Sequence, residues 1–371
     1  MQEQRHQPKG TASRWARASL LIAAALGVVL ACPPARAQPA DAELQSETAA
    51  ASVTSPLGSL EYTAGRGLRV GHTGLTLGGY GNVNLTRDEG GPARLAFDDL
   101  SLFVIADPNP RVHLFSETEF EDLLRVDDHG RGGTVDNRFL VERLYGDVSL
   151  TDELHVRVGK FLTPVGRWNV IHAQPLVWTT SRPLVTELPF DNHVTGAMLF
   201  GSFFPTAGEL NYSLYGQFVN QFERVPQPQA ADRSGGARVE YVTPSGLSVG
   251  SSYQAFARDN LWQHLIGLDT LWQRAPLEVM GEFVYEEAQR DLAAQWGLYL
   301  QSVLEVVPRF YLVGRYEHFD ERAPQPEVNL VVLGVAYKPT PPIILKAEYL
   351  FADHVAQESP PGLKCSFAIL F

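Results

Sequence analysis

The sequence predicts an all-β protein, a transmembrane antiparallel up-and-down β-barrel of sixteen strands. Three observations predict this fold class. Amphipathic strand patterns recur between residues 75 and 371, the connections between them alternate between short and long, and the chain ends on an alternating apolar strand that finishes at Phe371. Successive side chains of a strand point to opposite faces, so a barrel strand is apolar toward lipid and polar toward its lumen.

The first clear strand, residues 75–85, has this pattern. Leu77, Val83 and Leu85 share one face, and Tyr80 and Asn82 share the other. Further segments show the same pattern and bring the number of predicted strands to sixteen. A barrel of that strand number encloses an aqueous interior. The sixteen predicted strands span residues 75–85, 95–106, 111–122, 139–150, 154–161, 195–204, 209–219, 236–242, 247–256, 264–273, 277–286, 295–305, 309–319, 328–338, 343–351 and 363–371.

Connections of two lengths alternate along these strands, which favours a barrel with two unlike rims over a two-sheet sandwich. The short set contains residues that stop strands or fix φ, at 108–110, 151–153, 205–208, 243–246, 274–276, 306–308 and 339–342. The longer, more polar set covers 123–138, 162–194, 220–235, 257–263, 287–294, 320–327 and 352–362. Short turns face the periplasm in bacterial barrels, so an even strand count places both termini there.

The amino-terminal residues 1–37 are predicted to be a signal peptide. Four basic residues precede an apolar run at 18–31, which is too short to span a bilayer as a helix. Small residues at Ala35 and Ala37 suit cleavage before Gln38. Cys32 leaves lipoprotein processing open as the alternative.

Residues 38–70 show no sustained period and are interpreted as a flexible periplasmic segment ahead of the barrel at 71–371. A small plug or an oligomerising helix is the alternative for this segment. The segment at 41–51 is too short to form a stable coiled coil alone.

Composition excludes several classes of protein. Residues 1–37 hold five basic residues and one acidic residue, so the exported chain keeps 25 basic and 41 acidic residues, a net charge of −16. This balance argues against nucleic acid as a partner, because phosphate contacts need clustered Lys and Arg. Cys365 alone remains, so no intrachain disulfide can form. No later segment has eighteen consecutive apolar residues, which excludes a helical membrane protein.

Two segments resemble known families. The strand CSFAILF at 365–371 is similar to the C-terminal strand of bacterial outer-membrane barrels, whose terminal aromatic is recognised by the barrel-assembly machinery. The stretch VRVGKF at 156–161, followed by TPVG at 163–166, resembles the phosphate-selective porin superfamily. That resemblance extends weakly over the barrel through LTLGGYGNVNL at 75–85.

The resemblance implies a homotrimeric channel in the outer membrane of a Gram-negative cell, in contact with lipid and lipopolysaccharide. It implies passive diffusion of small hydrophilic solutes or ions, without a cofactor. The phosphate-transporting members carry a dominant basic ladder in the lumen, and this sequence departs from them by placing many acidic residues there. Phosphate selectivity is therefore not expected of this chain.

Strand parity predicts which charged residues line the lumen. On the strand at 139–150, Leu140, Leu144 and Val148 are assigned to the lipid face, which turns Arg143 inward. Opposed charges in a wet lumen select ions or stabilise the wall by pairing. The predicted pore-lining residues on strands are Arg143, Arg157, Arg238, Arg315, Lys346, Glu117, Glu119, Glu121, Glu278 and Glu282.

The connection at 162–194 is unusually long for a loop inside a compact domain. In general porins a long third loop folds into the lumen, and this connection is third in order. Arg167 and Arg182 would then line a constriction and attract anions. The alternative is that both are rim residues paired with Glu187 or Asp191.

Other functions find less support in the sequence. No nucleophile and base occur at a spacing that defines a catalytic arrangement, so no enzyme is predicted. Carboxylates two residues apart on a strand lie too far apart to chelate a metal tightly, so none is predicted. Two alternatives stay open: a hydrophobic-substrate transporter of fourteen strands plugged by residues 38–70, and a non-conducting structural barrel.

Overall fold

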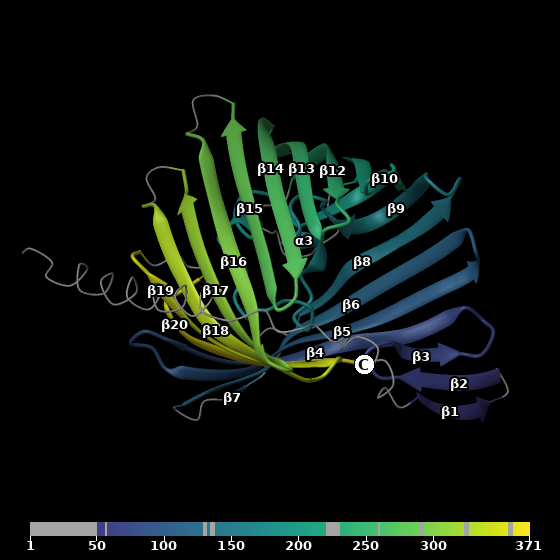
Figure 1. Cartoon of the computed structure of the whole chain (residues 1–371), viewed down its shortest axis with the longest axis horizontal. Helices are drawn as coiled ribbons and strands as arrows, with labels where there is room; N and C mark the ends of the chain where they lie inside the picture. Colours follow the sequence, from purple (N-terminus) through teal and green to yellow (C-terminus); the bar gives the residue numbers. More distant parts are fainter. Residues whose placement is uncertain are drawn as a thin grey trace, which may run out of the picture. The chain divides into compact units, whose positions relative to one another are not determined.

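A computed structural model describes residues 50–55, 58–128, 132–133, 138–219, 231–258, 260–289, 293–322, 326–354 and 359–371. Residues 47–371 form one compact unit, which contains a closed barrel (Figure 1). The predicted signal peptide at 1–37 lies outside the described residues. Each barrel strand pairs antiparallel with the next, and β20 pairs back with β4. The helices among the described residues lack the length and hydrophobicity needed to cross a membrane.

All sixteen predicted strands are confirmed. The barrel strands are β4 (Leu75–Asp88), β5 (Ala93–Asn109), β6 (Val112–Asp127), β8 (Arg138–Ser149), β9 (His155–Leu162), β10 (His193–Phe203), β11 (Glu209–Gln217), β12 (Arg233–Val242), β13 (Leu247–Arg258), β14 (Leu261–Arg274), β15 (Leu277–Ala288), β16 (Gln295–Val307), β17 (Phe310–Asp320), β18 (Val328–Thr340), β19 (Ile343–Ala352) and β20 (Gly362–Leu370). The short connections define one rim, the short-turn rim, at 110–111, 150–154, 204–208, 243–246, 275–276, 308–309 and 341–342.

Alternation along β14 illustrates why these residues form a barrel wall. Ile266 and Leu268 are each 50% exposed on the outer surface, whereas Leu265 and Asp269 are buried on the inner side. A period of two with apolar side chains outside is the pattern that a lipid-facing strand requires.

A β-bulge in β8 changes the strand parity and corrects the sequence-based assignment. In β8, Val141 pairs with Thr118 and Arg143 with Glu117, so Glu142 is the extra residue between them. Phe139 and Val141 are therefore the exposed residues beyond the bulge, and Leu140 was wrongly assigned to the lipid face. A bulge reverses every side chain on one side of it, and parity counted from the sequence cannot detect this.

The barrel closes at the C-terminus. Phe371 and Gly79 exchange both backbone hydrogen bonds at 2.9 Å, next to the pairing of β20 with β4. The earlier residues of β4 pair instead with β3 (Gly67–Val70), which follows β2 (Gly58–Thr63) and β1 (Ala50–Ser55). The second half of the segment at 38–70 thus forms three short strands, although its sequence has no sustained period. Figure 1 places the C-terminus beside β3 and β4.

We expect Gly79→Ala to weaken this closure. A Cβ atom at Gly79 would lie 2.1 Å from the carbonyl oxygen of Ser101 and 2.9 Å from the Phe371 ring, so the backbone must shift. Overpacking of this kind costs about 1–3 kcal/mol. The measurement is the temperature at which the purified barrel loses its folded, heat-modifiable form. Gly314→Ala is the matched control, because a Cβ there meets nothing within 4 Å. Equal unfolding temperatures for the two variants would contradict the prediction.

The connection between β9 and β10, residues 163–192, is called here the inner loop. It contains the short helices α3 (Trp168–Ile171) and η1 (Leu184–Thr186). Its residues Trp168, Leu184 and Val185 form one apolar cluster with inward side chains of the barrel, among them Phe256 and Met280. This cluster corrects the expectation that lumen positions are mostly charged or polar. One side of the lumen is packed like a protein interior.

Candidate functional site

Three wall carboxylates hold the backbone of the inner loop inside the barrel. Glu282 accepts hydrogen bonds from the backbone N–H groups of Arg167 and Trp168, at 3.0 and 2.6 Å. Glu348 accepts from Thr180 and Ser181, at 3.1 and 2.7 Å. Glu317 accepts from Leu184 at 2.7 Å. These backbone groups would otherwise be buried without partners, so the inner loop is tied to the wall formed by β15, β17 and β19.

Two basic residues of the same wall donate hydrogen bonds to other polar groups of the inner loop. Lys346 donates to the side-chain oxygen of Gln174 at 2.8 Å and to the carbonyl of Thr179 at 3.1 Å. Arg315 donates to the hydroxyl of Ser181 at 2.7 Å and to Glu317 at 2.7 Å. Both basic side chains are almost fully buried. The structure therefore places Arg315 and Lys346 beneath the inner loop.

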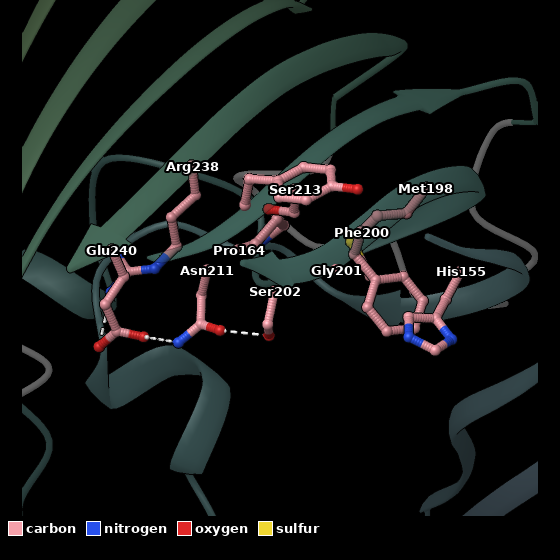
Figure 2. Close-up of a pocket in the computed structure, with 11 residues that line it drawn as sticks. His155, Pro164, Met198, Phe200, Gly201, Ser202, Asn211, Ser213, Arg238 and Glu240 are labelled. Carbon is pink, nitrogen blue, oxygen red and sulfur yellow. Dashed lines mark hydrogen bonds and ion pairs between the residues drawn. The ribbon is translucent and has the colours of Figure 1, made fainter. Parts of the chain in front are cut away.

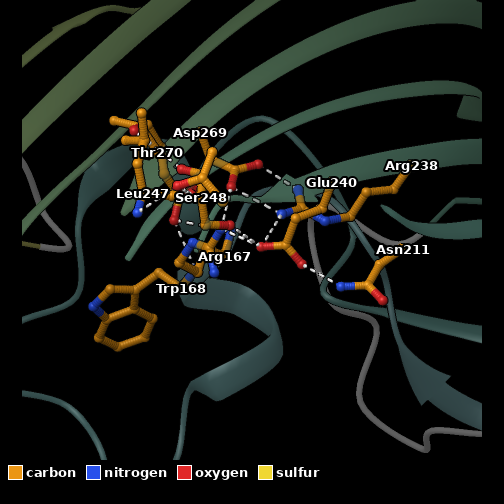
Figure 3. Close-up of polar contacts among 11 residues, drawn as sticks. Arg167, Trp168, Asn211, Arg238, Glu240, Leu247, Ser248, Asp269 and Thr270 are labelled. Carbon is orange, nitrogen blue, oxygen red and sulfur yellow. Dashed lines mark hydrogen bonds and ion pairs between the residues drawn. The ribbon is translucent and has the colours of Figure 1, made fainter. Parts of the chain in front are cut away.

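Arg167 and Arg238 meet two acidic residues at the beginning of the inner loop (Figure 3). Arg167 binds Glu240, contacts Asp269 at 3.2 Å and donates to the hydroxyl of Ser248 at 2.7 Å. Arg238 forms a two-pronged pair with Asp269. We call Arg167, Arg238, Glu240 and Asp269 the Arg167 cluster. It joins the loop to β12, β13 and β14, and its two arginines and two carboxylates balance, so it adds no net charge.

Arg182 has the pairing that was weighed as the alternative. Its guanidinium lies 2.8 Å from the carboxylate of Glu187 and 4.8 Å from the centre of the Trp168 ring. The two residues of each contact belong to the inner loop. Arg182 is thus neutralised within the loop itself.

The inward face of β4, β5, β6 and β8 carries an aromatic arc that the sequence analysis missed. Neighbouring ring centres in the arc of Tyr80, Phe103, Phe115 and Tyr145 lie 5.3–5.7 Å apart, on β4, β5, β6 and β8. The inward parity of these four positions is the signal that could have found it. Such arrangements add specific ring contacts to area burial.

Arginines stack on this aromatic arc. Arg143 lies over Phe115 at 4.7 Å and binds Glu117, and Arg157 lies over Tyr145 at 3.7 Å. Arg157 also forms two hydrogen bonds with Asp147, at 2.7 and 2.8 Å. Both arginines keep about a fifth of their side-chain surface exposed, at 19% and 21%. They border the part of the lumen that the loop leaves free.

The remaining predicted glutamates have separate surroundings. Glu278 accepts from the indole of Trp178 at 2.8 Å, so it too holds the inner loop. Glu119 accepts from the hydroxyl of Tyr80 at 3.3 Å, and Glu121 lies 3.1 Å from Arg138. We call the inward face of β5 and β6 that holds Asp98, Asp99, Glu119 and Glu121 the acidic wall.

The bulge residue Glu142 joins a residue of the inner loop, His172, and the first residue of β10, His193, to β8. His193 lies 2.8 Å and His172 3.7 Å from one oxygen of its carboxylate. Burial lowers the pKa of His172 to about 3, so this loop imidazole is neutral at physiological pH. The sequence analysis missed Glu142 because parity from the sequence ignored the bulge.

A cavity of about 340 Å³ opens beside the first residues of the inner loop (Figure 2). It is lined by His155 and Phe200 at one end and by Arg238 and Glu240 at the other. Asn211 lies between, 3.5 Å from Glu240. Both charged residues of the cavity belong to the Arg167 cluster. In the part of the chain that the structure describes, no group of three or more His, Cys, Asp or Glu side chains is placed to hold a metal ion.

Comparison with solved structures places this architecture. Superposition covers 80% of this chain and 99% of an anion-selective porin from Comamonas acidovorans, with a TM-score of 0.58 and 15% identity. The fold is that of the outer-membrane porins. An OmpF structure from Salmonella typhi, in complex with daunomycin, gives a TM-score of 0.59 at 10% identity over 80% of this chain and 97% of that chain. The outer-membrane channel DcaP of Acinetobacter baumannii gives 0.51 at 9% identity over 80% and 97%.

Sequence comparison does not assign the chain to a family. The chain is 24% identical over 343 residues to an uncharacterized protein of Aquifex aeolicus (strain VF5), covering 76% of each chain. No family model matches the sequence. Membership of the phosphate-selective porin superfamily, which the segment at 156–166 suggests, therefore stays a prediction.

Proposed function

We propose that the chain forms a water-filled outer-membrane porin for passive diffusion of small hydrophilic solutes or ions. The observation that carries the proposal is that wall carboxylates hold the inner loop inside the lumen while two arginines of the lumen wall keep exposed surface. The contacts of Glu282, Glu317 and Glu348 hold the loop against β15, β17 and β19. Arg143 and Arg157, which stack on the aromatic arc, keep 19% and 21% of their side-chain surface exposed. A narrowed pore bordered by charged side chains suits small polar solutes.

Hydrophobic-substrate transport is less well supported. Such a transporter needs an accessible apolar pocket, whereas the apolar inward residues of β13–β17 are covered by the inner loop.

The proposal also includes export through the signal peptide at 1–37, an orientation with the short-turn rim in the periplasm, and a homotrimer. A trimer form of OmpT, an outer-membrane protein of Vibrio cholerae with the same fold, supports the last point.

We further propose that the pore prefers cations. The predicted basic residues lie against carboxylates or under the inner loop, as described above. Asp98, Asp99 and Glu119 lie within 4.0 Å of no basic side chain in the described salt bridges. Unpaired carboxylates on the free side of the lumen attract cations.

The test of the channel itself is conductance in a planar bilayer. Purified protein, shown to be folded by its heat-modifiable migration on an electrophoresis gel, should produce discrete, stable conductance steps in KCl. A correctly folded barrel that never conducts would remove the diffusion-channel proposal and favour a structural barrel.

A further inference from the structure

A cluster of oxygen-bearing side chains lies where β4 and β5 pair on the acidic wall. Asn82 and Asn84 come from β4, and Asp98 and Asp99 come from β5. The register pairs Asn82 with Asp99 and Val83 with Phe97, so Asp98 is the extra residue of a β-bulge. A bulge can turn two adjacent side chains to the same side. Here it brings two neighbouring carboxylates against two inward amides.

The amides do not saturate this cluster. Asn84 donates from Nδ2 to an oxygen of Asp98 at 2.6 Å, and Asn82 donates to an oxygen of Asp99 at 3.4 Å. Each bond leaves the amide oxygen Oδ1 buried without a hydrogen-bond partner. Asn82 is fully buried and Asn84 is 8% exposed. Buried polar atoms without partners are uncommon in folded proteins and indicate a missing ligand, ion or water.

Positive charge is also missing from the cluster. The two arginines near this wall, Arg125 and Arg138, pair with Asp122 at 2.8 and 3.5 Å, and Arg138 also lies 3.1 Å from Glu121. Asp98 and Asp99 take part in none of the salt bridges among the described residues, and both keep partial exposure. Adjacent carboxylates with free amide oxygens form a donor set that a cation completes.

We propose that Asn82, Asn84, Asp98 and Asp99 form a Ca²⁺ site on the lumen wall. Ca²⁺ takes six to eight oxygen ligands, and it accepts carboxylates, Asn carbonyl oxygens and water in flexible geometry. The amide nitrogens face the carboxylates without the ion, and turning each amide over brings Oδ1 to that side in place of Nδ2. The four side chains then supply two carboxylates and two amide oxygens, and water from the lumen completes the shell. The site requires the barrel to fold but not to conduct, so its test does not depend on the proposed channel, although Asp98 and Asp99 also contribute to the proposed cation preference.

The test is a Ca²⁺ titration of the purified, EDTA-treated full-length barrel. Equilibrium dialysis measures binding, and the unfolding temperature measures the stabilisation that a native-state ligand produces. We expect a dissociation constant on the order of 10⁻⁴–10⁻³ M, the range of extracellular Ca²⁺ modules. The double variant Asp98→Asn/Asp99→Asn should bind at least about tenfold more weakly, since affinity follows ligand charge.

Two further variants make the result specific. Asp107→Asn carries the same substitution on the same strand, at a side chain that is 55% exposed, and should bind Ca²⁺ like the wild type. Asn82→Leu keeps both carboxylates and removes one amide oxygen, so its affinity should be intermediate. The Asp-to-Asn changes keep shape and remove like-charge repulsion, so the barrel should still fold.

The proposal would be overturned by a wild-type barrel whose unfolding temperature and Ca²⁺ content do not respond to Ca²⁺. Undiminished binding in Asp98→Asn/Asp99→Asn would overturn it equally. Equal stabilisation by Mg²⁺ would contradict the assignment to Ca²⁺, because Mg²⁺ demands near-octahedral geometry and gives up its waters reluctantly.

Discussion

Replacing residues 164–190 by a short Gly-Ser turn is expected to raise the single-channel conductance several-fold. The two ends of the inner loop already meet: Thr163 donates from its backbone to Asn192 at 2.9 Å and from its hydroxyl to Asp191 at 2.6 Å. A short turn can therefore join β9 to β10 without moving either strand. A barrel of this strand number without the loop keeps a wide aqueous lumen.

The shortened variant also uncovers apolar residues such as Phe256 and Met280, so we expect a lower unfolding temperature. Its conductance must be read from molecules that retain the folded, heat-modifiable form. Arg182→Gln is the matched control, because it removes a loop charge and leaves the loop in place. Unchanged conductance in the shortened variant would show that the inner loop does not limit the pore.

The second large effect is expected for Arg315→Ala. This guanidinium is 2% exposed, pairs with Glu317 and holds Thr179 and Ser181. Removing one partner of a buried pair leaves an uncompensated charge and costs about 3–5 kcal/mol. We expect a marked fall in the unfolding temperature, together with noisier conductance as the loop loosens from β17.

Arg315→Met/Glu317→Gln is the variant that separates charge from packing. It removes both charges and keeps an acceptor for the backbone of Leu184, so most of the lost stability should return. Arg182→Ala should cost far less, because its partner Glu187 is 29% exposed. If Arg315→Ala were no worse than Arg182→Ala, the assignment of Arg315 to a buried anchor would be wrong.

Much of the fold could be predicted because each barrel strand carries its own signal. Leu268 and Asp269 differ in exposure for a reason visible in the sequence, since lipid and lumen demand opposite polarity. The bulges at Glu142 and Asp98 could not be predicted, because an extra residue changes parity without changing composition.

The site was less predictable because its contacts connect distant parts of the chain. The length of the inner loop indicated its path into the lumen. It did not reveal that Glu282 would meet Trp168 or that Glu348 would meet Ser181. Strand parity placed Arg315 and Lys346 correctly on the inner face, but it could not show that the loop covers them. Inward-facing and pore-lining are therefore different properties in this barrel.

The reversal potential of the wild-type protein across a KCl gradient in a planar bilayer tests the central claim most directly. The inner loop covers some of the basic residues, and paired carboxylates neutralise the others. The acidic wall should therefore set the charge of the open part of the lumen. The account then predicts a reversal potential of the sign that K⁺ permeation sets. A clear Cl⁻ preference would contradict it and return control of the pore to Arg143, Arg157 and the other inward bases.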